Sequence, residues 1–168
     1  MRVEIKPGST PIACSQRRYP PDARKFMERY ANRILEYGFG EVTTEAKWIA
    51  APVITEKPPP ALYRFTMDYK NVNAVTEPIS WPMPHIDAEL VDVLGTKAFA
   101  LIDFVSGFWQ LPLERQSQNL LAFQTMDRII KPTRTTQGAK NSAPNFQSKV
   151  EPLFGNIKKN LKAWIDDL

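Results

Sequence analysis

The chain has 168 residues, 43% of them apolar, which is long and apolar enough for one ordinary domain with a buried core. Its formal net charge of +4 is compatible with a polyanionic partner but is too small to require one. The only cysteine, Cys14, excludes an internal disulfide and a cysteine-based zinc site, and the apolar stretches fall short of the roughly 20 residues of a membrane span, so a soluble intracellular protein is expected.

The first part of the chain predicts a lead-in, a helix and two strands. Residues 1–21 lack periodicity and predict an extended lead-in that lies on the remaining domain, residues 22–168. From residue 22 apolar side chains recur three or four apart until Gly38, which is typical of an amphipathic helix with a glycine stop. Residues 48–55 and 62–69 predict strands, with the prolines at 58–60 forming the turn between them.

The second part of the chain predicts further helices and strands. Residues 71–84 are rich in proline and predict a loop, and residues 86–94 predict a short helix. Residues 98–104 form a nearly continuous apolar run with one acid, Asp103, which predicts a buried strand. The remaining predictions are strands at residues 110–113, 120–125 and 129–131, and a helix at residues 142–154. Because strands and helices mix without strict alternation, the predicted fold class is α+β.

Three acids lie within apolar runs, namely Asp103 and the pair Asp166 and Asp167 in the final run at residues 161–168. Burying a carboxylate is costly unless it is paired or bound to a cation. Mg²⁺ prefers oxygen ligands, and two such ions can clamp the attacking and leaving oxygens in phosphoryl transfer. The three acids are therefore candidate metal ligands. Taken singly, however, the acids fit better a strand-end cap at Asp103 and a solvated turn at the pair.

A series of short motifs runs along nearly the whole chain. In order they read WIAAPV at 48–53, YRFTMDYKNVN at 63–73, WPMP at 81–84, IDFVSGFWQ at 102–110, QGAKNSAPNFQ at 137–147 and WIDD at 164–167. In this order the motifs resemble those of the reverse transcriptases of gypsy-type LTR retrotransposons. The resemblance implies the fingers and an incomplete palm with a ferredoxin-like split βαβ core.

The resemblance also implies an activity, which is RNA- or DNA-templated addition of deoxynucleotides to a primer 3′-hydroxyl. In this family the acids matching Asp103 and Asp166 hold two Mg²⁺ ions, for which Mn²⁺ is a possible substitute, and the acid matching Asp167 supports them. The implied partners are an RNA or DNA template with its primer and deoxynucleoside triphosphates, with no membrane. The implied location is the cytoplasm, within a virus-like particle.

Four further residues match nucleotide-binding positions of the family. Lys57 and Arg64 match the cations that grip the triphosphate, although each could be an ordinary exposed cation. Phe108 matches the aromatic that lies beneath the sugar and excludes a 2′-hydroxyl, and could equally belong to the core. Gln137 matches the residue that packs against the nucleotide, with a turn-stabilising glutamine as the alternative.

The chain departs from the family pattern in three ways. Trp164 replaces the usual tyrosine, and the prolines at 58–60 replace the usual Lys-Asp-Gly turn. The family's palm continues beyond the position of Asp167 into a return strand, a primer grip and a thumb, often followed by RNase H in a polyprotein. The fragment alone is therefore expected to be inactive.

Three other interpretations compete with an active polymerase segment. The first is a catalytically inactive retroelement relic or fragment that retains at most nucleic-acid binding. The second is a basic nucleic-acid-binding module without catalysis, and the third is an unrelated soluble scaffold. The order of the motifs makes the scaffold the weakest of the three.

Overall fold

The computed structural model describes residues 1–59, 63–91, 94–157 and 160–168. Helices and short strands mix along the chain, so the α+β prediction is confirmed. The helices are α1 (Pro21–Glu36), α2 (Lys70–Val75), α3 (Ile86–Val91), α4 (Arg115–Gln118) and α5 (Ser142–Leu153), with 3₁₀ turns η1 (Gly107–Gln110) and η2 (Gly155–Ile157). The strands are β1 (Gly40–Val42), β2 (Ala51–Glu56), β3 (Tyr63–Asp68), β4 (Phe123–Gln124) and β5 (Ile129–Pro132).

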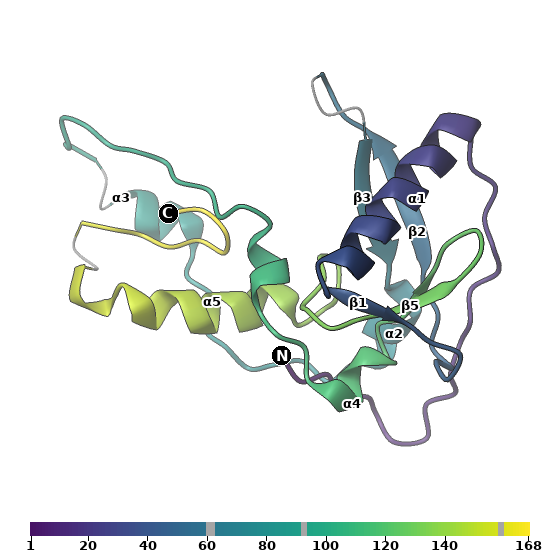
Figure 1. The fold of residues 1–168 in the computed structure, drawn as a ribbon. Helices are drawn as coiled ribbons and strands as arrows, with labels where there is room; N and C mark the ends of the chain where they lie inside the picture. The colour runs from purple at the N-terminus through teal and green to yellow at the C-terminus, as the bar shows by residue number, and fades with distance from the viewer. Residues whose placement is uncertain (60–62, 92–93, 158–159) are drawn as a thin grey trace.

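The strands form two small antiparallel sheets (Figure 1). β2 and β3 form a hairpin in which Ala51 pairs with Asp68 and Glu56 with Tyr63. The second sheet has the order β1-β5-β4. The two sheets meet where the Ala50 N–H donates to the Ala122 carbonyl at 2.8 Å and the Gln124 N–H to the Ala50 carbonyl at 3.1 Å. The hairpin therefore has a fixed position on the second sheet.

Helix α1 runs beside this hairpin and is the helix predicted from the apolar spacing. It begins with Pro21 in its first turn and ends before Gly38, whose φ of +67° favours glycine. Its buried side chains are Ala23, Met27, Ala31 and Ile34. On β3, Phe65 and Met67 are buried and alternate with more exposed residues, as the sequence predicted. The ring of Tyr30 stacks on that of Phe65, with centroids 4.5 Å apart.

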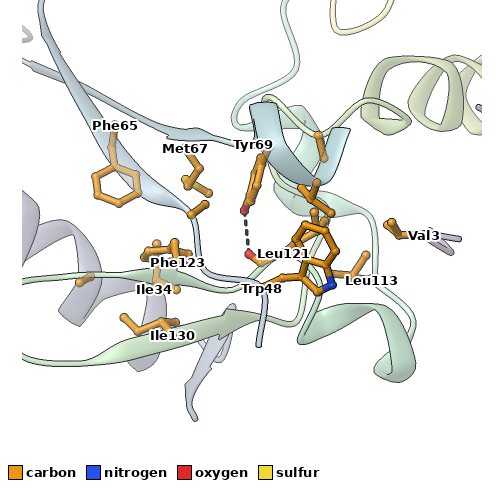
Figure 2. Packing of buried hydrophobic residues seen from close by; sticks show 14 of the residues in the cluster. Val3, Ile34, Trp48, Phe65, Met67, Tyr69, Leu113, Leu121, Phe123 and Ile130 are labelled. Carbon is orange, nitrogen blue, oxygen red and sulfur yellow. Dashed lines mark hydrogen bonds between the residues drawn. The ribbon is translucent and has the colours of Figure 1, made fainter. Parts of the chain in front are cut away.

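The main core lies between α1 and the two sheets (Figure 2). Phe123 and Ile130 are fully buried at its centre. Tyr69 is also buried, and its hydroxyl donates to the Leu121 carbonyl at 2.8 Å while accepting from the Thr136 hydroxyl at 3.2 Å. Burial raises the pKa of Tyr69 well above its usual range, so the hydroxyl stays neutral and keeps both hydrogen bonds.

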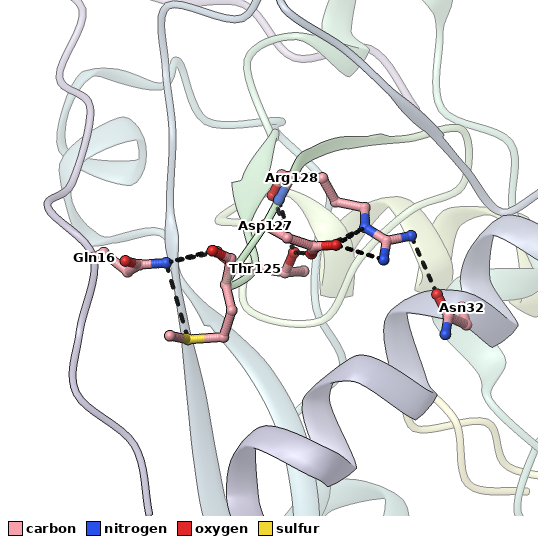
Figure 3. Close-up of polar contacts among 6 residues, drawn as sticks. Gln16, Asn32, Thr125, Asp127 and Arg128 are labelled. Atoms are coloured by element: carbon pink, nitrogen blue, oxygen red, sulfur yellow. Dashed lines mark hydrogen bonds and ion pairs between the residues drawn. The ribbon is translucent and has the colours of Figure 1, made fainter. Parts of the chain in front are cut away.

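The turn between β4 and β5 is held by polar contacts (Figure 3). The Thr125 hydroxyl donates to Asp127 at 2.9 Å, and the Arg128 guanidinium donates to both carboxylate oxygens of Asp127. These bonds lower the pKa of Asp127, with the Arg128 hydrogen bonds as the larger cause. Arg128 also donates to Asn32 of α1 at 3.2 Å. The strands predicted at residues 120–125 and 129–131 are thus correct in place, although β4 is shorter than predicted.

The lead-in, residues 1–20, has no helix or strand and lies along the body of the chain. Arg17 forms an ion pair with Asp68 at the end of β3. The Tyr19 hydroxyl donates to the Pro52 carbonyl at 2.6 Å. Nearer the start, the Val3 N–H donates to the hydroxyl of the buried Ser117 at 2.8 Å. The segment is therefore tied to the body at several separate points.

The predicted loop at residues 71–84 is wrong in its first part, which forms α2. A carboxylate oxygen of Asp68 accepts the Lys70 N–H at 3.3 Å near the start of the helix, and the Thr76 hydroxyl donates to the Val72 carbonyl at 2.7 Å. Val72 is buried in the core. Tertiary contacts thus stabilise a short helix that has little apolar periodicity.

The predicted strand at residues 110–113 is also wrong. Gln110 belongs to η1, and Pro112 forms only an isolated bridge with Arg134. The unpredicted helix α4 then begins directly after Glu114. The predicted turn at residues 58–60 and the end of the helix predicted at 86–94 lie partly outside the described residues.

The predicted buried strand at residues 98–104 is wrong. Only Asp103 in this segment forms a bridge, and Phe99 and Leu101 are 84% and 77% exposed. The apolar residues of α3 and its C-terminal flank are exposed as well, with Leu94 at 78%. A strand needs a partner along its length, and in the described part of the chain only residues 166–168 pair with this segment.

Candidate active site

Asp103 and the Asp166–Asp167 pair meet in a short antiparallel ladder. Ile102 and Leu168 exchange two backbone hydrogen bonds of 2.8 Å, and the Phe104 N–H donates to the Asp166 carbonyl at 2.8 Å. Asp103 and Asp167 are therefore directly opposed in a pair without hydrogen bonds of its own. In such pairs the side chains point to the same face, with Cβ atoms about 4.5–5.5 Å apart.

The second segment reverses direction at a tight turn. Trp164 and Asp167 exchange backbone hydrogen bonds of 2.9 and 3.0 Å, which leaves Ile165 and Asp166 as the two central residues. Ile165 has a φ of 56°, which is an outlier for a β-branched side chain. Ser106, three residues after Asp103, has a φ of 52°, and among the described residues no other non-glycine residue has a positive φ. Such outliers cluster at functional sites.

The environment of the acids differs from the prediction in one respect. Asp103 is exposed and the final pair is half-buried, so the burial cost that first singled out Asp103 does not apply. Two carboxylates directly opposed across a ladder nevertheless repel each other unless a cation lies between them. Their oxygen donors suit Mg²⁺, which commonly takes only one or two carboxylates from the protein. Within the described residues no three His, Cys, Asp or Glu side chains lie close enough together to hold a metal ion.

The two predicted triphosphate-binding cations lie on the β2–β3 hairpin. Arg64 is exposed on β3 and pairs with Thr55, and Lys57 follows the end of β2 and is also exposed. Neither forms an ion pair with any described residue. Both are thus available to an anion near the far end of the hairpin, away from the ladder that carries the acids.

Phe108 and Gln137 lie on separate elements. Phe108 is half-buried in η1, and its ring packs edge-on against Phe146 of α5, with centroids 5.5 Å apart. Gln137 is exposed in a turn next to Gly138, whose φ is +96°. The Asn73 side chain holds this turn by donating to the Gly138 carbonyl at 2.9 Å and accepting the Lys140 N–H at 2.8 Å.

Sequence reasoning did not single out the residue that contacts the acid-bearing turn most directly. Gln147 of α5 is fully buried, and its side chain donates to the Ala163 carbonyl at 2.9 Å and accepts the Ile165 N–H at 2.7 Å. Its position in the QGAKNSAPNFQ motif was the only signal available. An uncharged side chain that bonds only to backbone leaves no recognisable pattern elsewhere in the sequence.

Comparison with known proteins identifies the class of protein to which this fold and these motifs belong. Residues 55–168, more than half of the chain, match the family described as "Reverse transcriptase (RNA-dependent DNA polymerase)". The chain therefore belongs to the reverse transcriptase family. No helix of the described residues is long and apolar enough to cross a membrane.

Similar proteins come from transposons and viruses. The retrovirus-related Pol polyprotein from transposon opus of Drosophila melanogaster is 28% identical over 173 residues, which covers 100% of this chain and 17% of that protein. Polyprotein P3 of Commelina yellow mottle virus is 30% identical over 115 residues, or 68% of this chain and 6% of that protein. The chain thus spans less than a fifth of either polyprotein.

Solved structures confirm the fold. The foamy viral protease-reverse transcriptase in complex with an RNA/DNA hybrid matches 95% of this chain with a TM-score of 0.85 and 25% identity, and the matched part is 21% of that chain. The native prototype foamy virus enzyme matches the same share of this chain with a TM-score of 0.82 and 22% identity. The prediction of reverse transcriptase fingers joined to part of a palm is therefore confirmed.

Proposed function

We propose that the chain is the fingers and acid-bearing palm segment of a gypsy-type retrotransposon reverse transcriptase, and that it works within a longer Pol polyprotein. The match of the whole of this chain to part of the opus polyprotein and the order of the six motifs support this assignment. The observation that carries the activity is the ladder in which Asp103 lies directly opposite Asp167, next to Asp166.

The proposed reaction is nucleotidyl transfer. The primer 3′-oxygen attacks the α-phosphate of a deoxynucleoside triphosphate, a new phosphodiester bond forms, and pyrophosphate leaves. Asp103, Asp166 and Asp167 are the residues that would hold Mg²⁺, which neutralises charge on the reacting phosphate when bound. Lys57 and Arg64 would bind the triphosphate, Lys57 as a point charge and Arg64 as a planar fork.

The remaining candidate residues fit positioning of the nucleotide. The Phe108 ring is braced against Phe146, so it could present a fixed steric surface to the sugar. Gln137 lies exposed in a turn that Asn73 holds in place. The proposed partner is a template with its primer, because the foamy viral relatives were solved with an RNA/DNA hybrid and with double-stranded DNA.

Single-nucleotide incorporation tests the assignment. A longer form of the protein, in which this chain is followed by the rest of a reverse transcriptase palm and thumb, is given an RNA template annealed to a DNA primer, one matching deoxynucleotide and Mg²⁺. Asp103→Asn should lower incorporation by at least about a hundredfold, because even a roughly 1 Å misplacement of reacting groups has an effect of that size. Asp87→Asn is the matched control, since Asp87 is an exposed acid of α3. Incorporation that survives Asp103→Asn unchanged would contradict the assigned site.

A second candidate function is nucleic-acid binding without catalysis. It is favoured by the exposure of Asp103 and by the lack of a three-acid cluster among the described residues. Filter binding to the same template-primer over a range of salt concentrations separates the two candidates. Salt-dependent binding that persists in Asp103→Asn, together with no incorporation by the longer form that retains Asp103, would support binding alone.

A further inference from the structure

We propose that Gln147 is a positioning residue for the acid-bearing turn, and that Gln147 and its neighbour Phe146 together fix the two acid segments relative to each other. The inference rests on the proposed function, because it gives these two residues of α5 the task of aligning Asp103 with Asp166 and Asp167. Both side chains are buried and contact other residues of the chain.

The contacts of Gln147 are specific to the turn. Its side chain is fully buried. The amide nitrogen and oxygen form hydrogen bonds with backbone atoms of Ala163 and Ile165, which lie 16 and 18 positions further along the chain. A buried amide that loses its hydrogen-bond partners destabilises the fold, and the partners left unpaired destabilise it further. The turn is therefore joined to α5 by a pair of hydrogen bonds that no other side-chain type of this length reproduces fully.

The geometry of Ile165 explains why the turn requires support. A β-branched residue with a φ of 56° is held in a sparsely populated backbone conformation. The Gln147 oxygen accepts the N–H of this residue at 2.7 Å. Asp166 follows immediately, so release of Ile165 into a more common conformation would change the direction of the Asp166 and Asp167 side chains.

Phe146 acts in the same way on the other acid segment. It is buried, and its ring packs edge-on against Phe104 at 5.6 Å and against Phe108 at 5.5 Å. Gly107 lies so close that an added Cβ would come within 3.0 Å of the Phe146 ring. The segment that follows Asp103 is therefore seated on Phe146, one residue before the side chain that holds the opposite turn.

This arrangement matters because few other contacts hold the two segments. The ladder between residues 102–104 and 166–168 is short, and the apolar residues Leu101, Ile102 and Val105 beside Asp103 are exposed. Two adjacent buried residues of one helix thus reach both strands of the ladder. A shift of α5 would move both segments together, whereas the loss of one side chain would displace only one of them.

Three variants test the proposal. Gln147→Leu removes both amide bonds at similar size, Gln147→Asn is too short to keep both, and Phe146→Leu alters only the other segment. Ser142→Ala is the matched control, because Ser142 is a buried residue of α5 whose hydroxyl donates to the Thr136 carbonyl at 2.6 Å, away from the turn. The readouts are amide hydrogen exchange by NMR at Ile165 and Gly107, and Mn²⁺ affinity by electron paramagnetic resonance.

We expect Gln147→Leu to accelerate exchange at Ile165 at least about tenfold and to weaken Mn²⁺ binding by about tenfold, with Gln147→Asn in between. Phe146→Leu should accelerate exchange at Gly107 and not at Ile165, and should also weaken Mn²⁺ binding. Ser142→Ala should change neither readout, even if it lowers the melting temperature as much as the Gln147 variants do. Equal behaviour of the Gln147 variants and Ser142→Ala would overturn the proposal. An unmodified chain that binds no Mn²⁺ would overturn the proposed function, while exchange at Ile165 would still decide whether Gln147 holds the turn.

Discussion

The two halves of the molecule are held together in different ways. The fingers half, made of the lead-in, α1, α2 and the five strands, contains the continuous apolar core around Phe123 and Ile130. The palm half, made of α3, residues 98–110, α5 and residues 160–168, buries Phe146 and Val150 of α5 but exposes most of its other large apolar side chains. In Figure 1 the two halves lie side by side, with α3, α5 and the C-terminus together.

The fingers half provides most of the stability, whereas the palm half carries the candidate catalytic acids. Burial of apolar surface stabilises the fingers half, whereas the acids of the palm half depend on a short ladder, on Gln147 and on Phe146. Regions with few buried apolar contacts open at a lower free energy than a core. We therefore expect global unfolding to report on the fingers half, and local exchange and activity to report on the palm half.

The largest expected effect on stability comes from the centre of the fingers core. Phe123→Ala removes a fully buried ring that packs edge-on against the Phe65 ring, with ring centroids 5.6 Å apart. It should lower the free energy of unfolding by about 3–5 kcal/mol. Leu101→Ala in the palm half should change it by less than about 0.5 kcal/mol, because Leu101 is 77% exposed. Urea unfolding followed by circular dichroism measures both. Similar losses in the two variants would show that the halves do not differ as described.

A polar contact within the fingers core should have an intermediate effect. Tyr69→Phe removes a buried hydroxyl and leaves the Leu121 carbonyl and the Thr136 hydroxyl without this partner. The expected loss is about 1–3 kcal/mol. Tyr63→Phe is the control, since Tyr63 is only half-buried on β3. If urea unfolding gave equal midpoints for the two variants, the Tyr69 hydrogen bonds would contribute nothing net to the core.

The same division explains what the sequence could predict. The helix at α1 and the alternation on β3 follow from apolar periodicity, because these elements bury one face in a core made by the chain itself. Residues 98–104 have the composition of a buried strand but pair with the rest of the described chain only near Asp103. Composition indicates what a segment could bury and not whether a partner is present.

The candidate site shows a similar limit. The motif resemblance brought Asp103 together with Asp166 and Asp167, and the structure joins their segments in one ladder. It could not reveal α2, which depends on bonds from Asp68 and Thr76, or the role of Gln147, which depends on backbone atoms of a distant turn. The hydrogen bonds of Gln147 join residues far apart in the sequence, so residue type alone does not predict them.

The smallest expected effect comes from a surface contact of the fingers half, the ion pair between Arg17 and Asp68. The hydrogen bond from Arg17 is the main cause that lowers the pKa of Asp68. A carboxyl whose pKa is lower in the folded state stabilises the fold above its unfolded pKa of about 3.9, and this contribution is lost as the pH falls through the folded pKa. Both side chains are partly exposed, so the pair should contribute no more than about 1 kcal/mol at neutral pH.

Arg17→Ala should therefore lower the free energy of unfolding slightly at neutral pH, and the difference from the unmodified chain should shrink as the pH falls below about 4 and Asp68 becomes protonated. Urea unfolding at several pH values and two salt concentrations measures this, and added salt should reduce the neutral-pH difference as well. Arg18→Ala is the control, because Arg18 is exposed and forms no ion pair with the described residues. A loss in Arg17→Ala that is equal at every pH would show that the side chain acts through packing of the lead-in. In that case the lead-in would stabilise the fingers half in the same way as its core does, by burial and not by charge.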